Sequence, residues 1–232
     1  MSLFASFTKK SKLDATIKQT VQARKSEGVK ADQLFKGTYQ GYAEVLQDDP
    51  LRAAALYHWG FTLLHHAKTK SGDEAIKLYE DCISKFTFCM LIDPNYLGAA
   101  IDGGVAYMDL ARIKGVNSND ELYEMAKKQF EKANSIQAGT ASYNLACIHG
   151  LRGDSEECLK ALQNSKDKGS LPDAQDILND PDLDAVKNRD WFLEFMASLS
   201  KKTEEVVAEA PEAAAASDVA ASEENQAEEA AE

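Results

Sequence analysis

The sequence of 232 residues is short of the features that mark several protein classes. Four Cys and no secretory signal indicate free thiols in a reducing compartment rather than a disulfide scaffold. Five Pro and 13 Gly exclude a collagen-like or generally disordered chain. No apolar run approaches the roughly 20 residues needed to span a bilayer. What remains is an ordinary soluble composition, with 44% hydrophobic and 28% charged residues.

Basic residues are also scarce, with 26 Lys and Arg against 38 Asp and Glu, which gives a net charge of -12. Nucleic-acid binding requires clustered positive charge, so no nucleic-acid partner is expected. The charge is uneven: residues 203–232 carry ten acids and no base, residues 1–30 carry +5, and residues 31–202 carry -7. The Ala- and Glu-rich tail has too little apolar surface to offset its ordering entropy, and we predict that it is disordered.

The first 12 residues place Leu3, Phe4 and Phe7 before three lysines. This order is the reverse of a secretory signal, so we predict a basic leader, residues 1–30, that runs into the first helix. Two alternatives stay open: a membrane or partner anchor, and a mitochondrial presequence, although Arg24 is the sole Arg of that stretch. The expected location is cytoplasmic, with a mitochondrial or membrane-associated location as the alternative.

An internal repeat of 44 residues organises the chain. Small, aromatic and small residues recur at i, i+4 and i+7, a spacing that puts them on one helical face. The aligned positions are Thr38, Cys82 and Ala126, then Tyr42, Phe86 and Phe130, then Val45, Cys89 and Ala133. Upstream, Gly60 aligns with Gly104, and close helix packing explains why each lies inside an apolar-periodic stretch. Pro50 and Pro94 end the helices before them.

These residues resemble the tetratricopeptide repeat (TPR), whose pattern combines Gly and aromatic residues in paired helices and closes with Pro. Trp59-Gly60…Phe86…Pro94 follows that order, although two repeats carry ten residues more than the family norm. The resemblance implies an all-α fold, a helix-turn-helix solenoid over residues 31–168. Its units are a degenerate one over about 8–50, then 51–94, 95–138 and 139–168.

Residues 169–202 are similar to the closing segment of bacterial TPR proteins. We predict that Trp191, Phe192, Phe195 and Met196 form a capping helix, because stacked repeats leave an apolar end that must be covered. The alternative is that Trp191 and Phe192 face a partner.

No catalytic motif is found: the phosphate-binding, zincin and nucleophile-elbow patterns are all missing from the sequence. We therefore predict no enzyme activity, no cofactor and no metal. A metal-dependent regulator or an enzyme using His58, His65 or Cys147 is the competing hypothesis, since His58 and His65 are seven apart on a helix. Cys82 and Cys89 share that spacing but occupy small-residue packing positions.

The first helices of TPR units line a concave face, and the resemblance implies which residues form it. The expected partner-binding residues are Tyr57, Phe61, Leu64, Ile101, Val105, Met108, Tyr143, Asn144 and Cys147. This surface is chiefly apolar, and its helices offer only Arg52, Lys68 and Arg112 near their ends, so no carboxylate clamp is expected. An apolar peptide or helix of a partner protein suits it. Part of the face could instead be covered by residues 1–25.

The leading interpretation is a non-enzymatic interaction scaffold, adaptor or assembly factor that binds an apolar segment of another protein. The alternative is a membrane-associated adaptor tethered through its basic amphipathic N-terminus. The partner's identity and the oligomeric state do not follow from the sequence.

Overall fold

The computed structural model describes residues 3–49 and 52–208, with side chains for 11–49 and 52–199. The chain divides into two compact units, Met1–Asn188 and Arg189–Glu232. The predicted disordered tail lies outside the described residues from position 209 onward.

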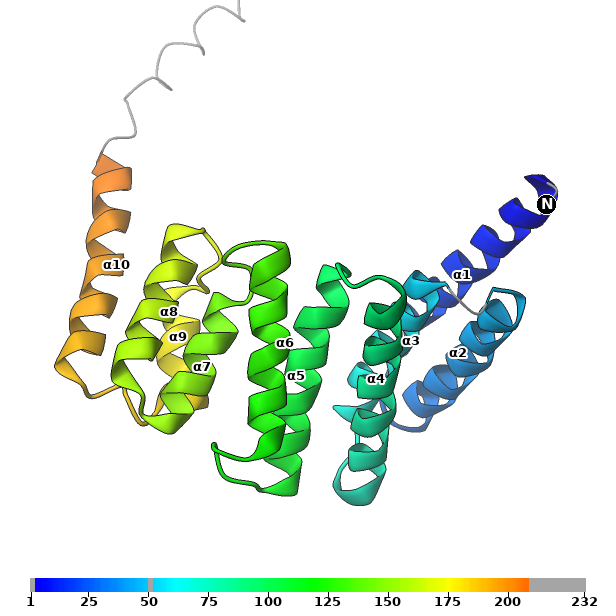
Figure 1. The fold of residues 1–232 in the computed structure, drawn as a ribbon, viewed down its shortest axis with the longest axis horizontal. Coiled ribbons are helices and arrows are strands. Elements are labelled where there is room, and N and C mark those ends of the chain that lie inside the picture. Colours follow the sequence, from blue (N-terminus) through cyan, green and yellow to red (C-terminus); the bar gives the residue numbers. More distant parts are fainter. Residues whose placement is uncertain (1–2, 50–51, 209–232) are drawn as a thin grey trace, which may run out of the picture. The chain divides into compact units, whose positions relative to one another are not determined.

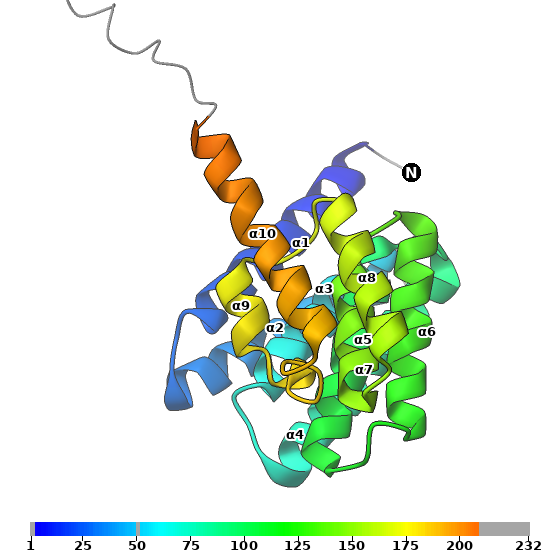
Figure 2. The same cartoon turned by 90° about the vertical axis from the view of Figure 1, so that its left-hand side faces the viewer.

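The described part of the first unit is helical throughout, and successive helices pack as neighbours (Figure 1). Its helices are α1 (Leu3–Arg24), α2 (Gly28–Asp48), α3 (Ala53–Ala67), α4 (Gly72–Ile92), α5 (Leu97–Lys114), α6 (Glu121–Ile136), α7 (Ser142–Arg152), α8 (Ser155–Asp167) and α9 (Ala174–Asn179), followed by the 3₁₀ turn η1 (Pro181–Leu183). The pairs α3–α4 and α5–α6 pack most extensively, α1–α2, α4–α5 and α7–α8 follow, and Figure 2 shows α7 and α8 side by side from a second direction. The predicted all-α helix-turn-helix solenoid is confirmed.

The predicted packing positions form the interior of these pairs. Tyr42, Phe86 and Phe130, spaced by 44, are all buried. A Cβ atom on Gly60 would lie 2.8 Å from the Phe86 ring, and one on Gly104 would lie 2.4 Å from the Phe130 ring. The same helix-to-ring contact thus occurs twice, 44 residues apart, because Gly lets each aromatic ring reach the backbone of the preceding helix.

The turns have local causes that the sequence carries. Gly115 and Gly153 end α5 and α7 in the left-handed conformation, with φ of 64° and 73°, which Gly adopts without a steric penalty. Asp120 caps α6 by accepting the N–H of Leu122. Helix α4 ends at Ile92, two residues before Pro94, whereas Pro50 lies outside the described residues.

The interior face of α1 combines apolar and hydroxyl side chains. Leu13, Ile17 and Val21 are spaced four apart, but Val21 is 44% exposed and Ile17 only half-buried. Leu13 is buried together with Thr16, Thr20 and Ala23. The Thr20 hydroxyl turns inward because the hydroxyls of Tyr42 and Thr62 meet it there, which an apolar pattern does not register. The Thr16 hydroxyl instead donates to the Lys12 carbonyl of its own helix.

The second unit contains α10 (Asp190–Ala208), which runs past the predicted tail boundary at residue 203. Residues 203–208 are therefore helical, because the Ala-, Glu- and Lys-rich sequence around them favours helix. Phe192 and Phe195 are buried, and the Trp191 and Phe192 rings meet edge to face at 5.6 Å. The capping role stays a prediction.

Candidate functional site

The residues expected to bind a partner lie on α3, α5 and α7, and the structure separates them into two groups. Six are half-buried and present part of their surface: Tyr57, Phe61, Ile101, Val105, Tyr143 and Asn144. We call these six the first-helix face. Leu64, Met108 and Cys147 are buried, at 3%, 3% and 5% exposure, so they support the face from below.

Tyr57 is the aromatic centre of the face. Its ring lies 4.9 Å from that of Tyr96 and 6.2 Å from that of Phe61. A Cβ atom on Gly98 would lie 2.9 Å from the Tyr57 ring, so this glycine allows the ring to approach the backbone of α5 closely. The Tyr57 hydroxyl donates to Asp102 Oδ2 at 3.0 Å, which joins α3 to α5.

Carboxylates lie between the apolar side chains, which the expectation of a chiefly apolar surface did not include. Burial raises the pKa of Asp102, although the Tyr57 hydrogen bond opposes this. Asp109 lies 3.6 Å from Lys68 Nζ and accepts from Arg112 Nη1 at 2.7 Å. The ion pair between Lys68 and Asp109 thus connects the C-terminal ends of α3 and α5, and the surface there carries charged as well as apolar side chains.

The chain itself covers the α7 part of the face, through Asp180 and η1. Asp180 Oδ2 accepts from the Tyr143 hydroxyl at 2.8 Å and lies 3.5 Å from Cys147 Sγ. Asp182 pairs with Arg112, and η1 packs on α7. Self-coverage therefore occurs at the α7 end, and at the α3 end Arg24 of α1 also lies over the Phe61 ring, so part of the coverage considered for residues 1–25 is present as well.

In the described residues, no group with metal-ligand spacing contains His58 or His65, so the hypothesis of a shared site with Cys147 gains no support. Within the described residues, the one group with metal-ligand spacing is Cys147, Asp180 and Asp182, whose ligand atoms lie within 4.8 Å of one another. Both carboxylates already accept from protein donors. Burial, followed by the Asp180 charge, raises the pKa of the Cys147 thiol, so the thiolate that a metal needs is disfavoured.

His66, which the sequence did not single out, is the buried histidine. Its Nε2 lies 2.8 Å from Asp32 Oδ1, and its Nδ1 lies 2.6 Å from the Tyr39 hydroxyl. Because a carboxylate only accepts, Nε2 donates and Nδ1 accepts, which is the pattern of a neutral imidazole. Burial lowers the pKa of His66 against the opposing effect of Asp32. This group joins α2 to α3 and is structural.

The residues that sequence reasoning missed are charged partners from distant parts of the chain. Asp102 and Asp109 are seven apart on one helix, so their shared face could have been read from the spacing. Asp180, Asp182 and Arg24 carried no such signal, because their partners lie 37 to 70 positions away.

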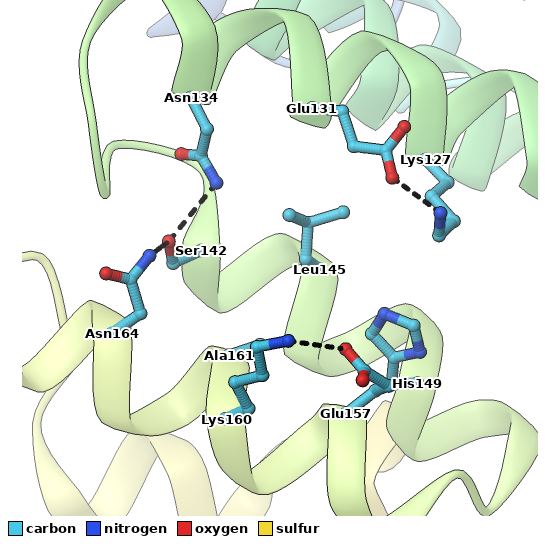
Figure 3. A pocket seen from close by; sticks show the side chains of 10 residues that line it. All are labelled: Lys127, Glu131, Asn134, Ser142, Leu145, His149, Glu157, Lys160, Ala161 and Asn164. Atoms are coloured by element: carbon cyan, nitrogen blue, oxygen red, sulfur yellow. Dashed lines mark hydrogen bonds and ion pairs between the residues drawn. The ribbon is translucent and has the colours of Figure 1, made fainter.

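A hollow of about 500 Å³ lies apart from the first-helix face, between α6, α7 and α8 (Figure 3). Its charged side chains pair with each other: Lys127 with Glu131, and Lys160 with Glu157. Asn134 and Asn164 both donate to Ser142 Oγ, at 3.2 and 2.6 Å. These donors and charges are satisfied internally, whereas Nδ1 of His149, which also lines the hollow, has no hydrogen-bond partner among the described residues and lies 3.5 Å from Asp154 Oδ2.

Comparison with known proteins finds one family. The sequence model described as "Plant specific mitochondrial import receptor subunit TOM20" matches residues 32–149, which run from α2 into α7 and include the whole first-helix face. No curated protein matches the chain.

Proposed function

The chain belongs to the plant-specific TOM20 family of mitochondrial import receptor subunits, and we propose that it is a non-enzymatic adaptor that receives a segment of another protein at a mitochondrial membrane. The family's described role supports a protein partner and the mitochondrial alternative over the cytoplasmic location expected from the sequence.

The observation that carries the proposal is the first-helix face. Tyr57, Phe61, Ile101 and Val105 are half-buried and present part of their apolar surface on α3 and α5, two helices that contact each other. Partly exposed aromatic and β-branched side chains in a row favour an amphipathic or apolar segment, which would remove their remaining surface from water. The segment would lie across α3 and α5, since residues 180–183 already cover α7.

The test is capture of a mitochondrial precursor protein, made by translation in vitro, on the immobilised full chain. Ile101→Gln with Val105→Gln should reduce capture about tenfold, because it replaces apolar contact surface on one face of α5. The matched control is Phe88→Gln with Leu91→Gln on α4, where both side chains are exposed, at 57% and 72%. Equal capture by both variants would refute the face as the binding site, and thermal melting checks that both fold.

Membrane association is the second part of the proposal, and α1 supports it. Among residues 3–49 and 52–208, no helix is long and apolar enough to cross a bilayer. Helix α1 begins at Leu3, so Leu3 and Phe7 fall on one helical face, ahead of Lys9 and Lys10. Their side chains lie outside those described. An apolar end followed by lysines can bind at a membrane interface through apolar burial and attraction to anionic lipid.

Flotation with liposomes containing anionic lipid tests the tether. The full chain should float, and the variant with Leu3, Phe4 and Phe7 changed to Ser should stay in the soluble fraction. Precursor capture should be unchanged in that variant, which separates the tether from the binding face. If both proteins floated equally, the N-terminal tether would be wrong.

A further inference from the structure

A small pocket of about 260 Å³ lies where the C-terminal ends of α1 and α3 meet. Its lining residues are Ala23, Arg24, Ser26, Phe35, His65, Lys68 and Thr69. Three of them have nitrogen donors that suit an anion, and no acid is among the described residues that line it. We propose that this basic pocket binds the side-chain carboxylate of an acidic residue in a peptide that lies on the first-helix face.

Arg24 is positioned without an acidic partner. Its guanidinium carbon lies 5.0 Å from the centre of the Phe61 ring, at cation–π distance. In the described part of the chain, no carboxylate lies within ion-pair distance of Arg24. The ring contact holds the guanidinium near the pocket, and its fork of N–H donors is suited to bidentate binding of a carboxylate.

The positive charges of Arg24 and Lys68 also affect His65, which lines the same pocket. Burial, then the charges of Arg24 and Lys68, lower the pKa of His65 to about 4. The imidazole is therefore neutral at pH 7 and contributes a neutral donor. On the α5 side, Asp109 lies 3.6 Å from Lys68 Nζ and offsets part of its charge. On the α2 side, Asp32 is held by Lys36 and Lys70, which leaves Arg24 as the uncompensated cation.

Phe61 connects the pocket to the first-helix face. Its ring contacts His65 at 4.4 Å on one side, lies under Arg24, and approaches Tyr57 at 6.2 Å. A peptide packed on Tyr57 and Phe61 would therefore bring a neighbouring side chain to the pocket. The expectation of no carboxylate clamp considered α3, α5 and α7 alone, whereas Arg24 comes from α1, 37 residues before Phe61.

A small probe tests the pocket independently of any import role. Full-length protein is titrated with N-acetylglutamic acid α-amide, and the His65 ring signals are followed by NMR. We expect saturable shifts and a rise of the His65 pKa above about 4, because a bound carboxylate offsets the positive field. N-acetylglutamine α-amide should produce neither. Absence of both effects with the glutamate probe would overturn the proposal.

Matched variants assign the effect to the residues. Arg24→Gln or Lys68→Gln should weaken binding of the glutamate probe about tenfold, as expected for loss of a charge-assisted hydrogen bond. Lys77→Gln, an exposed α4 residue outside the pocket, removes the same charge and should leave binding unchanged. If all three variants weakened binding equally, the probe would be responding to the general surface charge, and the proposed pocket would be refuted.

A peptide experiment tests the occupant and rests on the proposed function. Acetylated, amidated peptides with one Glu or one Gln between Leu residues are compared on the full chain. The Glu peptide should bind about tenfold more tightly, and Arg24→Gln should remove that preference. If the Gln peptide with a free C-terminus bound as tightly as the Glu peptide, the site would take a chain terminus instead. Failure of both peptides alongside success of the small probe would refute the peptide-binding face and leave the pocket intact.

Discussion

In the row of helices from α1 to α6, the first helices and the later helices are held together by different kinds of interaction. Between α3 and α6, the fully buried contacts are apolar: aromatic rings press onto glycine backbone, as at Gly104 and Phe130. Between α1 and α3, hydroxyls meet in the interior. Thr20 Oγ1 lies 2.9 Å from both the Tyr42 hydroxyl and Thr62 Oγ1, and all three side chains are buried.

This difference explains why the repeat is easy to recognise in the middle of the chain and degenerate at its start. Apolar packing reuses the same residue types in each copy, so it leaves a periodic trace in the sequence. A hydroxyl network works only when its partners coincide in space, and each copy of it is unique. The first pair therefore follows the same architecture with residues that look unsuited to an interior.

The largest effect should come from adding one methyl group in the apolar middle. Gly104→Ala forces the Phe130 ring to move, because the new Cβ would lie 2.4 Å from it. We expect a loss of about 2 kcal/mol in the free energy of unfolding, despite the better helix propensity of Ala. Gly37→Ala is the control, since nothing lies within 4 Å of its Cβ position, and it should gain about 0.5–1 kcal/mol. Urea unfolding measures both, and equal signs would show that ring-to-backbone packing does not distinguish the two sites.

A smaller effect is expected from the polar end. Thr62→Val keeps the shape but removes the hydroxyl that contacts Thr20 and donates to the His58 carbonyl at 2.7 Å. The loss should be about 1 kcal/mol, because the Thr20 hydroxyl is left with poorer partners in the interior. Thr87→Val, at an exposed site with the same type of backbone bond, should change stability by less than about 0.5 kcal/mol. Similar values at both sites would mean that the buried network contributes nothing beyond packing.

The smallest effect is a pH dependence confined to the polar end. The pKa of His65 falls to about 4 in the folded chain, chiefly through burial, whereas the unfolded value is near 6.5. Between these values, the unfolded chain binds a proton that the folded chain does not, so stability falls as pH falls from about 6.5 to 4. Since His65 is only half-buried, the contribution is below about 1 kcal/mol. Unfolding midpoints at pH 7 and pH 5 should lie closer together in His65→Gln without coinciding, because burial also lowers the pKa of His58 and His66. An unchanged pH slope would contradict the assignment.

The candidate site was predictable in part. Tyr57, Phe61, Ile101 and Val105 follow from the inward positions that the TPR resemblance implies, and all four retain exposed surface. The burial of Leu64, Met108 and Cys147 did not follow, because a helix wheel shows which side a residue occupies but not how closely the next helix approaches. The same limit hid the position of Arg24 over Phe61.

The sequence by itself determined the helices, their order and the apolar contacts repeated every 44 residues, because these arise from periodicity and from turn residues such as Gly115. Only the tertiary structure decided the polar pairs: Thr20 with Thr62, Arg112 with Asp182, and Arg24 beside His65. The physical reason is that side chains 41 to 70 positions apart meet through the accumulated geometry of several helices. No local pattern encodes that geometry, and it sets where charge gathers on the face that we propose to bind a partner.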